Sequence, residues 1–158
     1  MVIMKVDESF AEIIGQVHAT AWQQAYRNIF SRHYILQDSP YKRKAECIDA
    51  LCKNNAEYYL LMDEKVPVGI VKVSTTQKGI CEIESIYLLE EFQHKGYGTA
   101  AIDYIKSEFS DRTIILWVLE DNDSAIQFYK KNNFVFTGET RTIFRGKDYT
   151  QLCAVYKM

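Results

Sequence analysis

Two carboxylates in one short apolar stretch are the first residues that could do chemistry. Glu82 and Glu84 stand two positions apart in the run EIESIYL. Side chains two apart on a strand share a face, and neighbouring carboxylates raise each other's pKa. Such a pair suits a general base that removes a proton at neutral pH. The alternative is that both side chains simply face solvent.

A glycine-containing turn follows this stretch and carries a lysine but no acidic residue. Its members are Gln93, His94, Lys95, Gly96, Tyr97, Gly98 and Thr99. The apolar spacing after it predicts a helix, and the first turn of a helix attracts anions through its unpaired N–H groups and its dipole. We therefore predict that residues 93–99 cradle a pyrophosphate, with a mere tight turn as the alternative. Neither a P-loop nor the Gly-x-Gly-x-x-Gly fingerprint is present.

The elements that must position these residues can be predicted from apolar periodicity. Strands are predicted at residues 2–6, 57–62, 67–74, 82–88, 113–119, 134–137 and 149–156, and helices at residues 13–29, 41–53, 99–109 and 125–131. The segment from residue 82 to residue 119 should form a right-handed parallel strand–helix–strand unit. A polar stretch through residues 145–147 should join the last two strands.

Composition limits the class of protein. The 158 residues are 47% hydrophobic with a net charge of −2, which favours one globular domain over residues 1–158 and argues against a general nucleic-acid surface. No apolar run is long enough for a membrane span, and the N-terminus is too polar for a secretory signal. The four cysteines lack paired metal-ligand spacing. We expect a cytoplasmic protein without a metal site or a membrane or nucleic-acid partner.

Two motifs resemble the GNAT superfamily of N-acetyltransferases. The first is Gln93-x-x-Gly96-x-Gly98, which is similar to the acetyl-CoA-binding signature of that family. The second is residues 116–134, which resemble Asn-x-x-Ala-x-x-Phe-Tyr-x-x-x-Gly-Phe. Asn133 replaces the usual glycine, and asparagine also tolerates positive φ. Residues 81–158 resemble most closely the polyamine-acetylating bacterial branch.

This resemblance implies a fold, a reaction and a set of site residues. The fold is α+β, with a mixed, mostly antiparallel sheet of six or seven strands and helices on both faces. The reaction is transfer of an acetyl group from acetyl-CoA to a primary amine of a small, polyamine-like molecule. The implied cofactor contacts are Ile86, Tyr87, Leu88, residues 93–99, Asn122, Tyr129 and Lys131. Tyr129 is the implied general acid, Glu82 or Glu84 is the base, and Lys131 is alternatively only solvated.

The acceptor side is predicted from an aromatic series in the first helix and just beyond it. Trp22, Tyr26, Phe30 and Tyr34 recur at near-helical spacing and serve either packing or, with Glu84, acceptor binding. His18 on the same stripe is predicted to be a core histidine with satisfied hydrogen bonds, and residues 42–44 to be a solvated basic face. Other possibilities are a protein or peptide N-acetyltransferase and a non-catalytic acyl-CoA-binding module. Homodimers are frequent in the resembled family.

Overall fold

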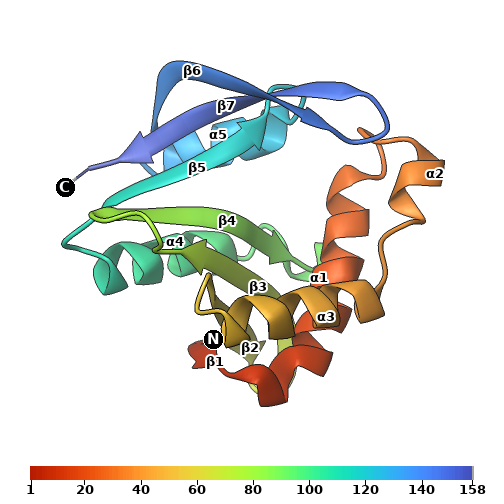
Figure 1. Ribbon diagram of the computed structural model, residues 1–158. Coiled ribbons are helices and arrows are strands. Elements are labelled where there is room, and N and C mark those ends of the chain that lie inside the picture. Colours follow the sequence, from red (N-terminus) through yellow and green to blue (C-terminus); the bar gives the residue numbers. More distant parts are fainter. Residues whose placement is uncertain (158) are drawn as a thin grey trace.

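Seven strands form one mixed sheet in the computed structural model, which describes residues 1–157. The strands are β1 (Val2–Val6), β2 (Glu57–Asp63), β3 (Val66–Ser74), β4 (Ile80–Leu88), β5 (Thr113–Leu119), β6 (Val135–Phe144) and β7 (Asp148–Tyr156). Their spatial order is β1-β2-β3-β4-β5-β7-β6, and only the β4–β5 pair is parallel (Figure 1). The α+β fold with a mostly antiparallel sheet is therefore confirmed.

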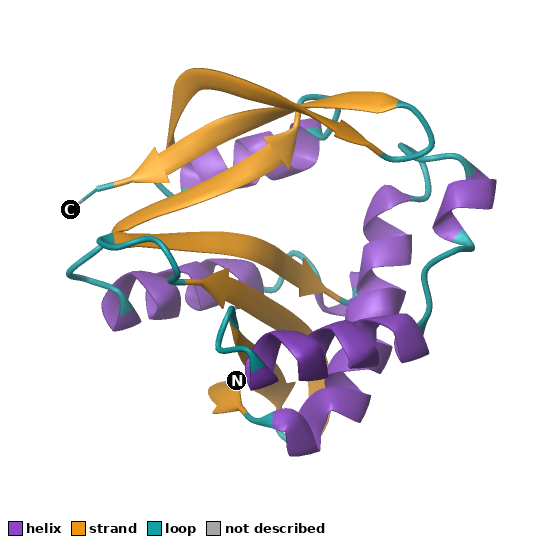
Figure 2. Cartoon of the chain, viewed as in Figure 1, coloured by secondary structure: helices purple, strands orange, loops and turns teal. Residues whose placement is uncertain are grey.

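Helices cover both faces of this sheet (Figure 2). They are α1 (Ala11–Tyr26), α2 (Arg32–Ile35), α3 (Pro40–Cys52), α4 (Tyr97–Glu108) and α5 (Asp123–Lys131), with short 3-10 helices η1 (Glu8–Phe10) and η2 (Glu90–Phe92). Strand β2 separates the two layers because its side chains alternate. Tyr58 and Leu60 pack with the α1 and α3 side chains, whereas Tyr59 and Leu61 pack with those of α4.

Strands β4 and β5 pair over a short length and then separate. Their register joins Ile80–Ile83 to Thr113–Leu116, and no pairing continues beyond Leu116. In Figures 1 and 2 the two strands diverge from this point toward α1. The second half of β4 is thus hydrogen-bonded to β3 on one side, while β5 does not cover its other edge.

A β-bulge in β4 changes which side chains share a face. Lys72 of β3 pairs with Ser85, but the next residue, Val73, pairs with Ile83, so Glu84 is the extra residue. A bulge of this kind re-aims the side chains that follow it. Simple alternation would place residues 82, 84, 86 and 88 together, but the bulge sends Ile86 and Leu88 to the opposite face from Glu82.

Two boundaries differ from the sequence prediction. Strand β6 continues to Phe144 because residues 140–144 pair with β7, so the predicted long polar connection is only a short turn. The first helix ends at Tyr26, and a separate short helix, α2, follows it. The remaining strands agree with the prediction to within two residues at each end. Tertiary pairing extended a segment whose composition is polar.

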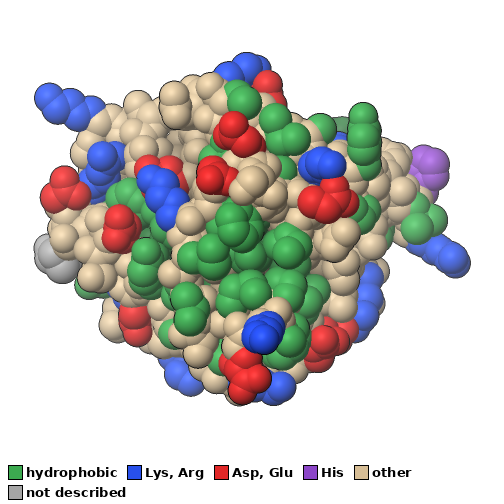
Figure 3. All heavy atoms as spheres, turned by 90° about the horizontal axis from the view of Figure 1, so that it is seen from below, with side chains coloured by type: hydrophobic (Ala, Val, Ile, Leu, Met, Phe, Trp, Pro, Cys, Tyr) green, Lys and Arg blue, Asp and Glu red, His purple; other side chains and the backbone are tan. Residues whose placement is uncertain are grey.

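The surface below the sheet in Figure 1 gathers hydrophobic side chains into one patch with charged side chains around it (Figure 3). Apolar patches on a surface are typical of contact sites. The homodimer expected from the resemblance stays a prediction, since no second copy is present. Among residues 1–157, no helix is both long and apolar enough to cross a membrane.

The close approach of α1 and α3 depends on Gly15. A Cβ added there would lie 2.5 Å from the Pro40 carbonyl oxygen and 2.9 Å from the Lys44 nitrogen, both backbone atoms. Gly15→Ala should therefore force the helices apart. Overpacking should exceed the propensity gain of alanine and lower the free energy of unfolding by about 1–2 kcal/mol, measured by urea denaturation. Thr20→Ala, exposed on the same helix, is the control and should change it by less than about 0.5 kcal/mol. A Gly15→Ala variant as stable as the wild type would contradict this packing.

Candidate active site

The N-terminus of α4 is built to leave its amides free. Helices α2, α3 and α5 each begin with a side-chain cap, from Ser31, Ser39 and Asn122 respectively. Helix α4 instead has Gly96 as its N-cap, which has φ 87° and provides no side-chain hydrogen bond. A left-handed φ of this size favours glycine. The first-turn N–H groups of α4 therefore have neither an intrahelical nor a side-chain acceptor, which is the arrangement that binds anions.

These amides open into a cavity of about 520 Å³ between β4, α4 and α5. Its lining includes Ile86, Leu88, Gln93, His94, Gly96, Gly98, Thr99, Ser124, Ala125, Gln127, Phe128, Tyr129 and Lys131. Most of the predicted cofactor contacts thus lie around one cavity. Gln93 also fixes the turn itself, because its side-chain Nε2 donates to the Leu88 carbonyl at 3.2 Å.

Four predicted cofactor contacts have side chains placed elsewhere. Lys95 lies over the Phe92 ring, with 5.2 Å from Nζ to the centroid. The Tyr97 hydroxyl donates to Asp63 at the end of β2. The Asn122 side chain caps α5 by accepting from the Ala125 N–H at 3.2 Å. The Tyr87 side chain lines a different cavity, described below, because of the β4 bulge.

Tyr129 lies in the lining of the first cavity and packs against aromatic neighbours. Its ring centroid is 5.2 Å from that of Phe128 and 5.7 Å from that of Phe134. Burial raises the pKa of Tyr129 well above its ordinary value, and the nearby Tyr26 adds to this. The phenol consequently stays protonated at neutral pH and is able to donate a proton or a hydrogen bond. Asn133, which follows α5, has φ 64°, so it adopts the conformation for which its motif normally uses glycine.

A second cavity, of about 660 Å³, lies on the opposite face of the sheet, on the side of α1 and α3. Strand β4 lines both cavities: Glu82, Glu84, Ser85 and Tyr87 face this one, whereas Ile86 and Leu88 face the first. The predicted acceptor residues Trp22, Tyr26 and Phe30 line it as well. The sheet divides the two cavities only up to the point where β4 and β5 diverge.

The aromatic series forms one wall of the second cavity and also packs. Trp22 and Tyr26 have ring centroids 5.4 Å apart, and Tyr26 and Phe30 stack at 4.8 Å. The turn of the β6–β7 hairpin lies beside α2, as Figure 1 shows. The Tyr149 hydroxyl donates to the Ile29 carbonyl at 3.0 Å, and the Tyr149 ring meets Phe30 edge-on at 5.0 Å. The same residues therefore pack and line the cavity, while their role in acceptor binding stays a prediction.

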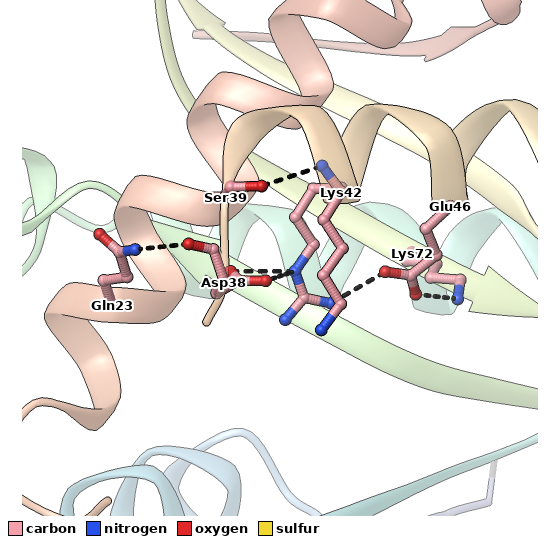
Figure 4. Close-up of polar contacts among 7 residues, drawn as sticks. Gln23, Asp38, Ser39, Lys42, Glu46 and Lys72 are labelled. Carbon is pink, nitrogen blue, oxygen red and sulfur yellow. Dashed lines mark hydrogen bonds and ion pairs between the residues drawn. The ribbon is translucent and has the colours of Figure 1, made fainter. Parts of the chain in front are cut away.

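A chain of ion pairs forms the α3 side of the second cavity (Figure 4). Arg43 bonds Asp38 at 2.9 Å and Glu46 at 2.9 Å, and Lys72 bonds Glu46 at 3.3 Å and Glu84 at 2.8 Å. The Arg43 side chain is only 16% exposed. The expectation of a solvated basic face is therefore wrong for Arg43, because acidic partners from the preceding loop and its own helix draw it inward.

The two candidate bases have different surroundings. Glu84 is paired with Lys72, and burial alone would lower the pKa of Lys72, but Glu84 and Glu46 outweigh it and raise that pKa. Glu82 forms no ion pair within residues 1–157. Burial raises the pKa of Glu82, the Arg141 charge opposes this shift, and Glu84 adds to it. Glu82 is therefore the carboxylate of the pair that is not held by a cation.

His18 is buried but not satisfied, contrary to the sequence prediction. It is 1% exposed and lines the second cavity, and neither ring nitrogen has a hydrogen-bond partner within the described chain. Burial lowers the pKa of His18 to about 3, helped by the charges of Arg43 and Lys72. The ring is neutral and packs 5.4 Å from Tyr87. Both ring nitrogens are therefore buried without a protein partner.

Several lining residues had no sequence signal. Asp38, Glu46, Lys72, Trp117, Arg141, Arg145 and Gln151 come from four separate parts of the chain. Their types are ordinary for surface positions, and only the pairing of β5, β7 and β6 brings the last four to the cavity. Within residues 1–157, no group of three or more His, Cys, Asp or Glu side chains is arranged to hold a metal ion.

Comparison with known proteins assigns the family. Residues 16–134 match the model of the acetyltransferase (GNAT) family. The chain therefore belongs to this family and to the class of acyltransferase enzymes. A 90-residue segment is 37% identical to an uncharacterized N-acetyltransferase, MJ1207 of Methanocaldococcus jannaschii. That match covers 51% of this chain but only 38% of the relative's length.

Solved structures share the whole fold at low identity. The PaiA N-acetyltransferase of Thermoplasma acidophilum, in complex with coenzyme A, superposes with a TM-score of 0.78 at 19% identity and covers 98% of both chains. The yncA structure of Salmonella typhimurium, with its cofactor acetyl-CoA, has a TM-score of 0.73 at 14% identity, covering 99% of this chain and 93% of that one. A ribosomal-protein-alanine N-acetyltransferase of Brucella melitensis has a TM-score of 0.75 at 13% identity over the full length of both chains.

Substitution of Thr99 should affect the stability of helix α4 and the binding of coenzyme A in opposite directions. Thr99 is exposed in the first turn of α4 and lines the first cavity. In Thr99→Asp the carboxylate should stabilise the unliganded helix by about 0.3–1 kcal/mol through the dipole. The same charge should repel phosphate and weaken coenzyme A binding by about 10-fold or more, measured by calorimetry. Thr99→Asn is the matched neutral control, and equal coenzyme A affinity in the two variants would count against the cradle.

Proposed function

We propose that this protein transfers the acetyl group of acetyl-CoA to a primary amine of a small molecule, by direct attack in a ternary complex. One observation carries the proposal: two cavities on opposite faces of the sheet share β4 as a wall and lie beside the divergence of β4 from β5. One cavity has free helix amides and the other has carboxylates and aromatic side chains. A carrier in the first and an amine in the second can meet only at this divergence.

The first cavity fits the carrier. The amides of residues 96–99 would hold its pyrophosphate, with Gln93, His94 and Lys131 at the rim. The β4 edge at Ile86–Leu88 that β5 leaves uncovered would pair with the carrier's amide groups, as an added strand does. Lys95, Tyr97 and Asn122 would contribute through their backbone, since their side chains are engaged elsewhere. Acetyl-CoA supplies the acyl group as a thioester.

Glu82 is the proposed base. An alkyl amine is mostly protonated at neutral pH, so one proton must leave before it attacks. Glu82 takes this proton directly or through a water, and its raised pKa makes it a better acceptor than an exposed glutamate. Glu84 holds Lys72 in place and orders the wall around the amine.

Tyr129 is the proposed general acid. It lines the carrier cavity, and its phenol is kept protonated by burial. From there it would donate a proton to the sulfur of the departing thiolate. Placing the base and the acid on opposite sides of the divergence separates proton removal from proton donation.

The β6–β7 turn beside the acceptor cavity favours a small molecule over a peptide. The β6–β7 turn packs against α2, where a Cβ at Gly146 would lie 3.6 Å from the Tyr34 ring. An extended peptide would need this roof to be open. A non-catalytic acyl-CoA-binding module is disfavoured because a protonated phenol and an unpaired carboxylate both line the cavities.

Loss of the base should change the pH dependence of turnover. For the wild type, kcat should fall as pH decreases through the pKa of Glu82, which lies above the ordinary value of 4.5 because burial disfavours the carboxylate. Glu82→Gln should remove this acidic limb and lower kcat by about 10²- to 10⁴-fold. The limb is measured by thiol release at saturating acceptor. Glu84→Gln is the comparison and should keep it, whereas loss of the limb in Glu84→Gln alone would assign the base to Glu84.

Loss of the phenol should affect turnover more than binding. Tyr129→Phe keeps the ring packing against Phe128 and Phe134 but removes the proton donor. We expect kcat to fall about 10²-fold or more while the coenzyme A dissociation constant changes by less than about 3-fold. Stopped-flow or steady-state thiol release and calorimetry provide the two values. An unchanged kcat would remove Tyr129 from the reaction.

A further inference from the structure

The charges around the acceptor cavity do not match a polycation. Its lining carries five cationic side chains and four carboxylates, namely Lys42, Arg43, Lys72, Arg141 and Arg145 against Asp38, Glu46, Glu82 and Glu84. The resemblance of residues 81–158 to the polyamine-acetylating branch implies an acceptor with several positive charges. The observed lining has no excess of acid and would not attract a molecule with several positive charges.

Ion pairs within the cavity leave its unpaired positive and negative side chains in different places. The ion-pair chain holds Asp38, Glu46 and Glu84 against Arg43 and Lys72, so all five groups have a partner and one negative charge is left in excess. One carboxylate, Glu82, is left on β4, and the cations left over are Lys42, Arg141 on β6 and Arg145 in the turn after β6. No ion pair involves these three cations within residues 1–157. The cavity therefore has an anionic position at β4 and a cationic side at β6.

The cationic side is ordered rather than loose at Arg141. Its guanidinium lies 4.4 Å over the Trp117 ring centroid, and its Nε donates to Gln151 Oε1 at 2.7 Å. Only one of its five N–H donors is used by this bond, so a fork of donors is left on a fixed plane. Stacking on Trp117 lowers the entropy lost when that fork binds an oxyanion.

Arg145 extends the same side toward the aromatic wall. It lies four residues beyond Arg141 on the β6 side of the hairpin, and Ile143 between them also lines the cavity. Its Nη1 donates to the Phe144 carbonyl at 2.8 Å, and its charge acts on the Tyr26 hydroxyl across the cavity. Two guanidinium groups thus line one side of an otherwise internally paired cavity.

We propose that the acceptor carries an oxyanion, a carboxylate or a phosphate-type group, that binds Arg141 and Arg145 while its primary amine lies at Glu82. The inference rests on the proposed acetyl transfer at the same site. The stem between the two groups would lie along Trp117 and the aromatic wall, whose faces suit methylene groups. Both ends of such an acceptor meet an unpaired partner of opposite charge, whereas a diamine would place its second charge against two guanidinium groups.

A set of acceptors that differ only at the far end tests this assignment. The set is butylamine, aminobutanoate, aminobutylphosphonate and diaminobutane, with the hexyl series as a second length. Binding to the coenzyme A-saturated protein is measured by calorimetry. We expect the carboxylate or the phosphonate to bind about 10-fold or more tightly than the alkylamine, and the diamine to bind least well. The carboxylate and phosphonate arms tell the two oxyanions apart. Diamine binding equal to or tighter than that of both oxyanions would overturn the inference.

Variants of the cationic side provide a second readout. Arg141→Gln should weaken oxyanion binding by about 10- to 100-fold without weakening butylamine binding, because it removes a positive charge that acts on Glu82. Arg141→Lys should be intermediate, because it keeps the charge but loses the fork. Lys78→Gln removes an exposed charge from the β3–β4 turn and is the control. Melting temperatures check that each variant is folded, and equal loss of all four acceptors in a folded Arg141→Gln would contradict a specific anion contact.

Thiol release from acetyl-CoA is followed with the same compounds so that the two proposals can fail separately. Acceptor affinities in the expected order, with the oxyanions tightest and dependent on Arg141, but without thiol release by any acceptor, would refute acetyl transfer and support the oxyanion position. Thiol release that is fastest with the diamine and insensitive to Arg141 would support acetyl transfer and refute the oxyanion position.

Discussion

The separation of β4 from β5 is the constraint on which both cavities depend. Two parallel strands that stayed paired would seal the sheet, and the cavities on its two faces would have no connection. Here the register ends at Ile83 and Leu116. The bulge at Glu84 falls just after this end, so the same strand presents polar side chains to one cavity and apolar side chains to the other. A break in regular pairing thus organises the site.

Charge neutralisation decides which groups stay reactive. Five charged side chains form one continuous chain from Asp38 to Glu84, and each is held by a partner of opposite sign. Ion pairs in a partly buried setting hold side chains in place, and removing one partner leaves a costly unpaired charge. The paired groups therefore form part of the cavity wall, and none of them is left without a partner. Glu82, Arg141 and Arg145, which are outside this chain, are the groups that a ligand can meet.

Segments from both ends of the chain close the acceptor cavity. The α1–α2 segment supplies the aromatic wall, and the β6–β7 hairpin covers it through Tyr149 and the turn at Gly146. Their shared apolar cluster contains Trp22, Phe30, Ile35, Leu119 and Tyr149, which are far apart in sequence. The shape of the acceptor cavity therefore depends on how the α1–α2 segment packs against the β6–β7 hairpin, which no local sequence pattern predicts.

The sequence by itself determined the fold class, the family, most strand boundaries and the position of the helix that follows Gly96. These follow from local properties: apolar periodicity, a glycine turn without acidic residues, and an asparagine able to adopt φ 64° after α5. Only the tertiary structure decided that β6 reaches Phe144, that Glu84 is paired while Glu82 is not, and that His18 lies unsatisfied in a cavity. Each of these depends on a partner distant in the chain, whether a paired strand, a lysine on β3 or a ring on β4. Periodicity predicts on which face of a helix or strand a residue lies, but not which residues pack against that face.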